Sequence, residues 1–130
     1  MTHALRDGFA TEDILQVLSS LTEPQLDDLN FGVIGFDGGS VVHRYNAFES
    51  QAAGLSRERV VGQPLFTVVA PCMNNYLVAQ RFEDAYEHAA DLDETIGYVL
   101  TLRMRPVKVR LRLLASPGLL MRYVLVQRAV

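Results

Sequence analysis

Three side chains in this sequence could act together on a small molecule: a cysteine, a tyrosine and a glutamate. Cys72 is the single cysteine, and as a thiolate it could attack an acyl group. We expect it just ahead of a long helix, whose first N–H groups and dipole would stabilise that thiolate. Tyr45 and Glu49 are expected at the end of a strand and in the first turn of a helix. A phenol and a carboxyl in one pocket could bind a buried oxyanion, and Glu49 would then stay protonated.

Each of these residues also has an ordinary structural interpretation. A lone cysteine is most often a small buried thiol. A cysteine nucleophile needs an activating base, yet His3, His43 and His88 fall in no recognisable motif. Glu49 could simply complete a capping box with Asn46 at the start of a helix. From the residues alone, both interpretations stay open.

The composition indicates one folded domain in a reducing compartment. The chain has 130 residues, of which 49% are hydrophobic and 21% charged. One cysteine allows neither an internal disulfide nor a cysteine-rich zinc cluster, so we expect a cytoplasmic protein. No apolar run approaches the roughly 18 residues of a membrane span, and the first residues do not resemble a signal peptide. The net charge of −3 argues against binding to nucleic acid.

Two short helices are expected before the first strand. Thr11 is the expected N-cap of the first helix, whose first turn would hold Glu12 and Asp13. Residues 22–25 fit a capping box, and the second helix is expected to end near Asp28.

The remaining patterns predict an α+β domain with a five-stranded antiparallel sheet and helices on one face. Residues 37–40 are typical of a hairpin turn, and strict alternation from residue 107 onward is typical of a half-buried strand. The expected strands are residues 31–36, 41–45, 97–105, 107–114 and 119–127, and the expected helices between them are residues 46–54, 57–60 and 75–90.

Charge is distributed unevenly along the chain. Residues 1–102 carry all 15 acidic residues, whereas residues 103–130 carry seven basic residues and no acidic one. We expect acidic N-terminal helices to cover a basic stripe on the sheet. Exposed ion pairs contribute only about 0–1 kcal/mol each, so such a cap would be detachable. The acids are Asp7, Glu12, Asp13, Glu23, Asp27 and Asp28, and the stripe is Arg103, Arg105, Lys108, Arg110 and Arg112, with no interleaved aromatics for nucleic-acid stacking.

The sequence resembles the photoactive yellow proteins, bacterial blue-light receptors with the PAS fold, along nearly its full length. The most specific match combines Tyr-Asn-Ala-Phe-Glu at residues 45–49 with Ala-Pro-Cys at residues 70–72. Further matching stretches are residues 31–34, 61–62, 104–106 and 124–128. The resemblance implies a single PAS photosensory domain over residues 1–130, with an N-terminal helical cap (residues 1–29) and a PAS core (residues 30–130).

The same resemblance implies a chromophore and its site. The family attaches p-coumaric (4-hydroxycinnamic) acid as a thioester to a cysteine, here Cys72. Tyr45 and a protonated Glu49 would hold its phenolate. Tyr98 matches a tyrosine near the chromophore, and Met104 matches a methionine that assists the return to the dark state.

The resemblance also implies a signalling mechanism. Light would isomerise the chromophore, Glu49 would pass its proton to the phenolate, and a buried carboxylate would be left without a partner. Such a charge costs several kcal/mol, comparable with the stability of a small domain, so the N-terminal cap is expected to rearrange. We expect a monomer that signals to a downstream protein whose identity the sequence does not give, with no membrane or nucleic-acid partner.

Departures from the family pattern keep alternatives open. Ala53 replaces a threonine whose hydroxyl bonds to the tyrosine, and Leu55 replaces an arginine over the chromophore. Both positions still count as expected chromophore contacts. The matches to Tyr98 and Met104 assume one extra residue in a loop over residues 91–94. The main alternative is a chromophore-free PAS module for ligand binding or dimerisation. A cysteine-dependent acyl-transfer enzyme using Cys72 is a third class.

Overall fold

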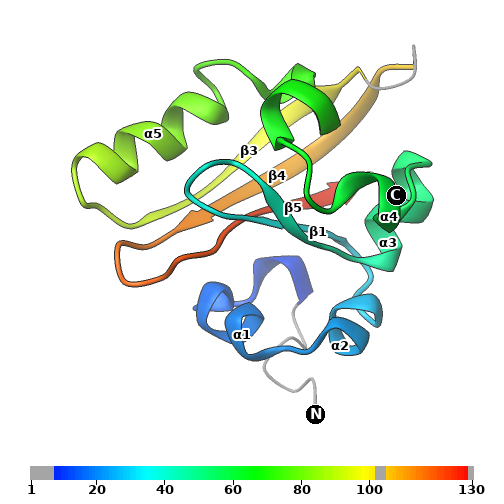
Figure 1. Ribbon diagram of the computed structural model, residues 1–130, viewed down its shortest axis with the longest axis horizontal. Coiled ribbons are helices and arrows are strands. Elements are labelled where there is room, and N and C mark those ends of the chain that lie inside the picture. The colour runs from blue at the N-terminus through cyan, green and yellow to red at the C-terminus, as the bar shows by residue number, and fades with distance from the viewer. Residues whose placement is uncertain (1–7, 102–104, 129–130) are drawn as a thin grey trace.

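The computed structural model describes residues 8–101 and 105–128 of the chain. Five strands and a series of short helices follow one another along it (Figure 1). The elements are η2 (Gly8–Ala10), α1 (Ile14–Ser20), α2 (Glu23–Asp27), β1 (Gly32–Phe36), β2 (Val42–Tyr45), α3 (Ala47–Ala53), α4 (Arg57–Val60), η3 (Leu65–Val69), η4 (Pro71–Met73), α5 (Ala79–Glu87), β3 (Leu92–Leu100), β4 (Val107–Ala115) and β5 (Arg122–Arg128).

The five strands form one antiparallel sheet in the order β2-β1-β5-β4-β3, which confirms the predicted fold class. The first and last strands of the chain, β1 and β5, are therefore paired in the middle of the sheet. The N-terminal helices α1 and α2 lie on one side of the sheet, and α5 lies on the other (Figure 1). No helix in the described part of the chain is long and apolar enough to span a membrane.

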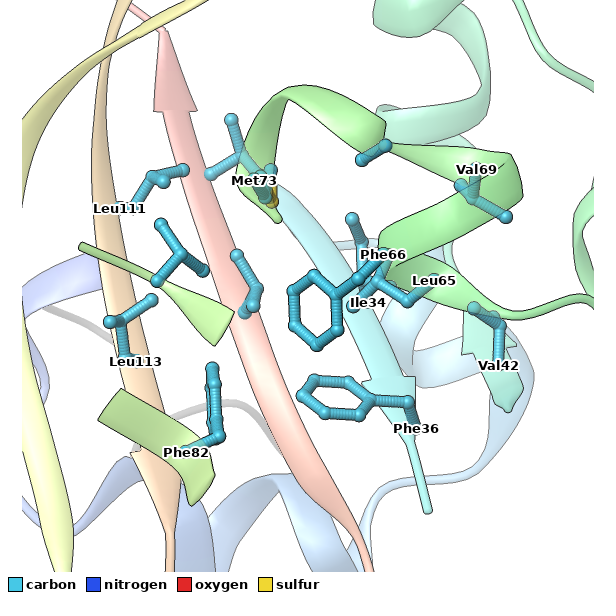
Figure 2. Packing of buried hydrophobic residues seen from close by; sticks show 14 of the residues in the cluster. Ile34, Phe36, Val42, Leu65, Phe66, Val69, Met73, Phe82, Leu111 and Leu113 are labelled. Atoms are coloured by element: carbon cyan, nitrogen blue, oxygen red, sulfur yellow. The ribbon is translucent and has the colours of Figure 1, made fainter. Parts of the chain in front are cut away.

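Each face of the sheet carries its own hydrophobic cluster, because neighbouring strand residues point to opposite faces. Ile34 of β1 packs in the larger cluster, which we call the main core, and Val33 packs in the smaller one, the cap core. In the main core the rings of Phe36 and Phe82 lie 5.0 Å apart, edge to face (Figure 2). The cap core consists of Phe9, Ile14, Leu18, Leu26, Leu29, Phe31, Val33, Leu114, Tyr123 and Leu125.

The structure corrects two element boundaries. Strand β3 begins at Leu92, so residues 92–94 belong to a strand rather than to the expected loop. Helix α5 begins at Ala79 rather than near residue 75, because the Asn75 side chain accepts the backbone N–H groups of Leu77 and Val78 and forms a separate turn. Within the range expected for this helix, Phe82 is buried, whereas Tyr76 and Tyr86 are 77% and 73% exposed.

The start of α1 also differs from the prediction. The Thr11 hydroxyl donates to the carbonyl of Gly8 at 2.7 Å instead of capping the helix. Asp13 takes the N-cap position with a left-handed φ of 54°, so Glu12 and Asp13 precede the helix. The capping box of α2, with Thr22 as N-cap and Gln25 as its partner, is confirmed.

The expected basis of cap attachment is wrong. Arg112 is the buried member of the predicted basic stripe, and its partners are the carbonyls of Phe9 and Thr11 and the carboxylate of Asp93 on β3. None of the described acidic residues of the cap pairs with it. Asp7 and Arg103 lie outside the described residues.

Two cap acids pair with bases outside the stripe instead. Glu23 pairs with Arg44 of β2, and Asp27 pairs with Arg57 of α4. Arg44 also donates to the carbonyls of Leu18 and Leu21. Together with the cap core, these bonds from arginine to carbonyl groups hold the N-terminal helices on the sheet.

Candidate functional site

Tyr45 and Glu49 lie at the junction between β2 and α3. Tyr45 is the last residue of β2, and its side chain is 1% exposed in the main core. The next residue, Asn46, is the N-cap of α3 and accepts the backbone N–H of Glu49 at 3.1 Å. This cap starts the helix so that Glu49, in its first turn, is only 2% exposed.

The carboxyl of Glu49 forms a two-pronged ion pair with Arg128 at the end of β5. The Nη1–Oε1 and Nη2–Oε2 distances are 2.7 and 3.1 Å. The expected capping box is therefore only half formed, because this carboxyl does not return to the N–H of Asn46, which donates to the carbonyl of Val33. Arg128 is a site residue that the sequence analysis did not identify; the two partners are 79 positions apart in the chain, and only its place in a matching stretch marked it.

Gly32 of β1 makes room for the Glu49 carboxyl. A Cβ atom at position 32 would lie 2.0 Å from Glu49 Oε1 and 3.0 Å from Cδ. The backbone of β1 thus forms a wall of the site, and only glycine permits so close an approach.

Burial determines the ionisation of both groups. Desolvation raises the pKa of Glu49, and the guanidinium of Arg128 opposes that rise. Burial also raises the pKa of Tyr45, and the nearby Glu49 carboxylate raises it further. Tyr45 therefore keeps its proton.

Cys72 lies in the short turn η4 and is partly buried against the main core. Helix α5 begins at Ala79, so the expected stabilisation of a Cys72 thiolate by the start of that helix is wrong. The backbone here is fixed by side chains instead. The Tyr98 hydroxyl donates to the carbonyl of Cys72 at 2.5 Å, and the Asn75 amide donates to both that carbonyl and the Tyr98 oxygen. Asn75 is a second residue that the sequence analysis missed.

The structure brings most of the expected site residues to the main core. Tyr45 belongs to this cluster, and Leu55, Cys72 and Tyr98 pack against it as partly buried residues. Ala53 is buried near the end of α3 but is not part of that cluster. Met104 lies outside the described residues.

A base that could make Cys72 a catalytic nucleophile is not found among the described residues. His43 pairs with Asp37 at 2.8 Å, and the ring of His88 contacts the carbonyl of Asp84. In the same part of the chain no three histidine, cysteine or acidic side chains are grouped to hold a metal ion.

A cavity of about 510 Å³ lies away from this site, between the end of α5 and the turn that joins β4 to β5. Its walls include Phe82, Tyr86 and Arg122 but none of the residues expected to bind a chromophore.

Comparison with known proteins gives consistent relatives. Residues 26–128 match the family model described as PAS fold. The photoactive yellow protein of Rhodothalassium salexigens is 31% identical over 105 residues, which cover 81% of this chain and 83% of the relative. The photoactive yellow protein of Halochromatium salexigens is 30% identical with the same coverage.

Comparison with solved structures also finds PAS domains with a similar fold. The crystal structure of the photoactive yellow protein domain from the sensor histidine kinase Ppr of Rhodospirillum centenum superposes with a TM-score of 0.79 at 33% identity, covering 87% of this chain and 98% of that one. The PAS domain of an HTR-like protein from Haloarcula marismortui gives a TM-score of 0.65 at 14% identity, covering 88% and 99%. The second likeness concerns the fold alone.

Proposed function

This chain belongs to the photoactive yellow protein family within the PAS fold, and from that premise we propose that it is a blue-light photoreceptor carrying p-coumaric acid as a thioester on Cys72. It is a photosensory domain and not an enzyme. The observation that carries the proposal is the buried pair of Tyr45 and Glu49 beside the apolar cluster against which the Cys72 thiol packs.

The described residues fit such a group. An aromatic acid needs apolar surroundings, and Leu55, Cys72 and Tyr98 pack against the apolar main core. Its anionic end needs hydrogen-bond donors, and Tyr45 is a buried residue whose hydroxyl can donate. When bound, p-coumaric acid supplies a double bond that isomerises in light and a phenol that can lose its proton.

A few side chains would each have a separate role in attaching the chromophore and in transferring the proton. Cys72 would attack the acyl carbon of an activated p-coumarate, forming the S–C bond as the activating group leaves and the thiol proton passes to solvent. Tyr45, kept neutral by burial, would donate a hydrogen bond to the phenolate. Glu49, whose pKa burial raises, would hold a second proton there and transfer it after illumination.

The remaining expected contacts would lie around the chromophore. Leu55 and Tyr98, which pack against the main core, would contact the chromophore between its two ends, and the buried Ala53 would offer no hydroxyl to Tyr45. For Met104 we propose the role that the family resemblance implies, which is to assist the return to the dark state.

The output would pass through the N-terminal cap. Asn46, next to Glu49 in the site, donates to the carbonyl of Leu26 in α2, so a change in α3 reaches the cap directly. A partner protein in the cytoplasm, where the free thiol stays reduced, would sense the altered cap.

Reconstitution tests the proposal. The purified chain is mixed with an activated thioester or anhydride of p-coumarate and followed by absorption and mass spectrometry. We expect a yellow protein with one adduct on Cys72, bleached by blue light and recovering in darkness. Cys72→Ala should fold and stay colourless. Absorption that light does not change would contradict the proposal.

The alternative, a chromophore-free PAS module, is favoured by two observations. The acceptor atoms of Glu49 are already taken by Arg128, and positions 53 and 55 lack the polar side chains of the family pattern. A colourless protein with unmodified Cys72 after the same treatment would select this alternative, whereas steady release of free acid would indicate an acyl-transfer enzyme.

A further inference from the structure

The ion pair between Glu49 and Arg128 has a geometry suited to an ionised carboxylate. Both guanidinium nitrogens of the Arg128 fork face the two oxygens of one carboxyl group, at 2.7 and 3.1 Å. The side chains are 3% and 18% exposed, so solvent screens the pair only weakly. Two-pronged pairs of this kind are among the strongest charge-assisted hydrogen bonds.

Several elements surround this carboxyl, and they contribute few charges. Strand β5 contributes Arg128, and strand β2 contributes the neutral Tyr45. Strand β1 contributes Gly32, whose missing side chain leaves room for the carboxyl, and α3 itself contributes the backbone N–H of Glu49 bonded to Asn46. Within the described residues, Arg128 is therefore the cation that contacts Glu49.

We propose that Arg128 is the resident counter-ion of Glu49, so that a negative charge formed on this carboxyl is neutralised inside the site. This inference rests on the proposed function for its role in the light response, but the pair itself exists in the protein alone. The family pattern expects an arginine at position 55, where this chain has leucine. Here the positive charge beside Glu49 comes from Arg128, at the end of a central strand.

The proposal changes the expected light response. When Glu49 gives up its proton, the carboxylate does not appear in the protein without a partner, because the guanidinium already faces it. A buried charge that keeps its partner costs far less than an isolated one. We therefore expect a smaller driving force for release of the N-terminal cap than an uncompensated charge would provide.

The test uses the chromophore-free protein, so it does not depend on pigment binding. Glutamate side-chain carboxyl carbons are labelled with ¹³C, the Glu49 signal is assigned by its absence in Glu49→Gln, and its titration midpoint is measured. Replacing Arg128 with glutamine should raise that midpoint by about 1–3 pH units, the usual effect of losing a close opposite charge.

Arg122→Gln is the matched control. Arg122 lies on the same strand, and its guanidinium sits 5.2 Å from the ring of Tyr86 rather than near Glu49. This variant removes the same charge and should leave the Glu49 midpoint unchanged. An equal midpoint in the wild type and in Arg128→Gln would overturn the proposal, as would an equal shift in both variants.

A second measurement covers the case in which Arg128→Gln does not fold. In the wild-type protein the ¹⁵Nε signal of Arg128 should shift with pH at the same midpoint as the Glu49 carboxyl. If the Arg128 signal did not change at the midpoint of the Glu49 titration, the pairing would be refuted. If the protein passed these tests but never became yellow, the counter-ion proposal would stand and only the proposed function would be refuted.

Discussion

At the scale of single residues, Glu49 has the most demanding environment in the site. It is a carboxyl in an almost fully buried position, enclosed by a strand backbone at Gly32 and bonded to a guanidinium. Burial favours its neutral form and Arg128 favours its ionised form, so small changes nearby can decide which of the two is present.

The first prediction concerns colour. In the reconstituted protein, Glu49→Gln should shift the absorption maximum to longer wavelength, because an amide hydrogen bond stabilises a ground-state phenolate less than a carboxyl one does. The absorption spectrum in darkness measures this directly. A shift to shorter wavelength would mean that Glu49 does not contact the phenolate.

The second prediction concerns the wall of the site. Gly32→Ala would place a methyl group 2.0 Å from Glu49 Oε1, so the chain must shift or the ion pair must open. We expect a loss of about 1–3 kcal/mol in the free energy of unfolding, measured by urea denaturation. Gly97→Ala is the matched control, since a Cβ there meets nothing within 4 Å. Equal stability of the two variants would argue against the close packing.

At the scale of elements, Asn46 joins the site helix to the sheet and to the cap. Its side-chain oxygen accepts the N–H groups of Val33 and Glu49, and its amide donates to the carbonyls of Leu26 and Phe31. All four bonds are 3.0–3.1 Å long, and the residue is fully buried. One side chain therefore satisfies backbone groups from several elements.

Removing this side chain is the third prediction. Asn46→Ala should lower the free energy of unfolding by at least about 2 kcal/mol, because it removes a helix N-cap and leaves buried polar groups without partners. Asn74→Ala, at an exposed position, should change it by no more than about 0.5 kcal/mol. Denaturant midpoints of the two variants provide the comparison, and similar midpoints would show that water replaces the lost bonds.

Local patterns in the sequence correctly predicted those structural features that depend on residues close together in the chain. The hairpin after Phe36 and the capping box at Thr22 are confirmed, and the helix expected over residues 46–54 ends at Gly54, a glycine in the αL conformation. Each depends on chemistry within about four residues, which is where backbone preferences act.

Features that depend on distant partners could not be predicted in the same way. The pair of Glu49 with Arg128 and the bonds of Arg112 to Phe9 and Thr11 join opposite ends of the chain. The charge pattern indicated that the ends attract, but it did not show that arginines would bind carbonyl groups rather than acids. The capping box at Asn46 failed for the same reason, because a distant guanidinium offers Glu49 a stronger partner than a local N–H.

At the scale of the whole molecule, the sheet separates two hydrophobic clusters of different composition. The main core lies on the face with α5, and the cap core lies between the sheet and the N-terminal helices. Apolar contacts and arginine bonds hold the cap, so it is attached more firmly than exposed ion pairs alone would allow.

Cap attachment provides the fourth prediction. Arg112→Gln should speed amide hydrogen exchange in the cap, residues 8–29, while leaving the central strands β1 and β5 protected, because it removes the bonds to Phe9 and Thr11. Lys108→Gln, an exposed change on the same strand, is the control. Uniform exchange changes across the sheet would mean that the cap does not open separately.

Arg44, Tyr45 and Asn46 are consecutive residues, and their side chains serve different faces of the sheet. Arg44 binds carbonyls of the N-terminal helices, Tyr45 is buried on the opposite side, and Asn46 holds the start of the next helix. Any displacement of this short backbone segment therefore moves side-chain contacts on both faces of the sheet. No chain of intermediate contacts through the interior is required for the two surfaces to move together.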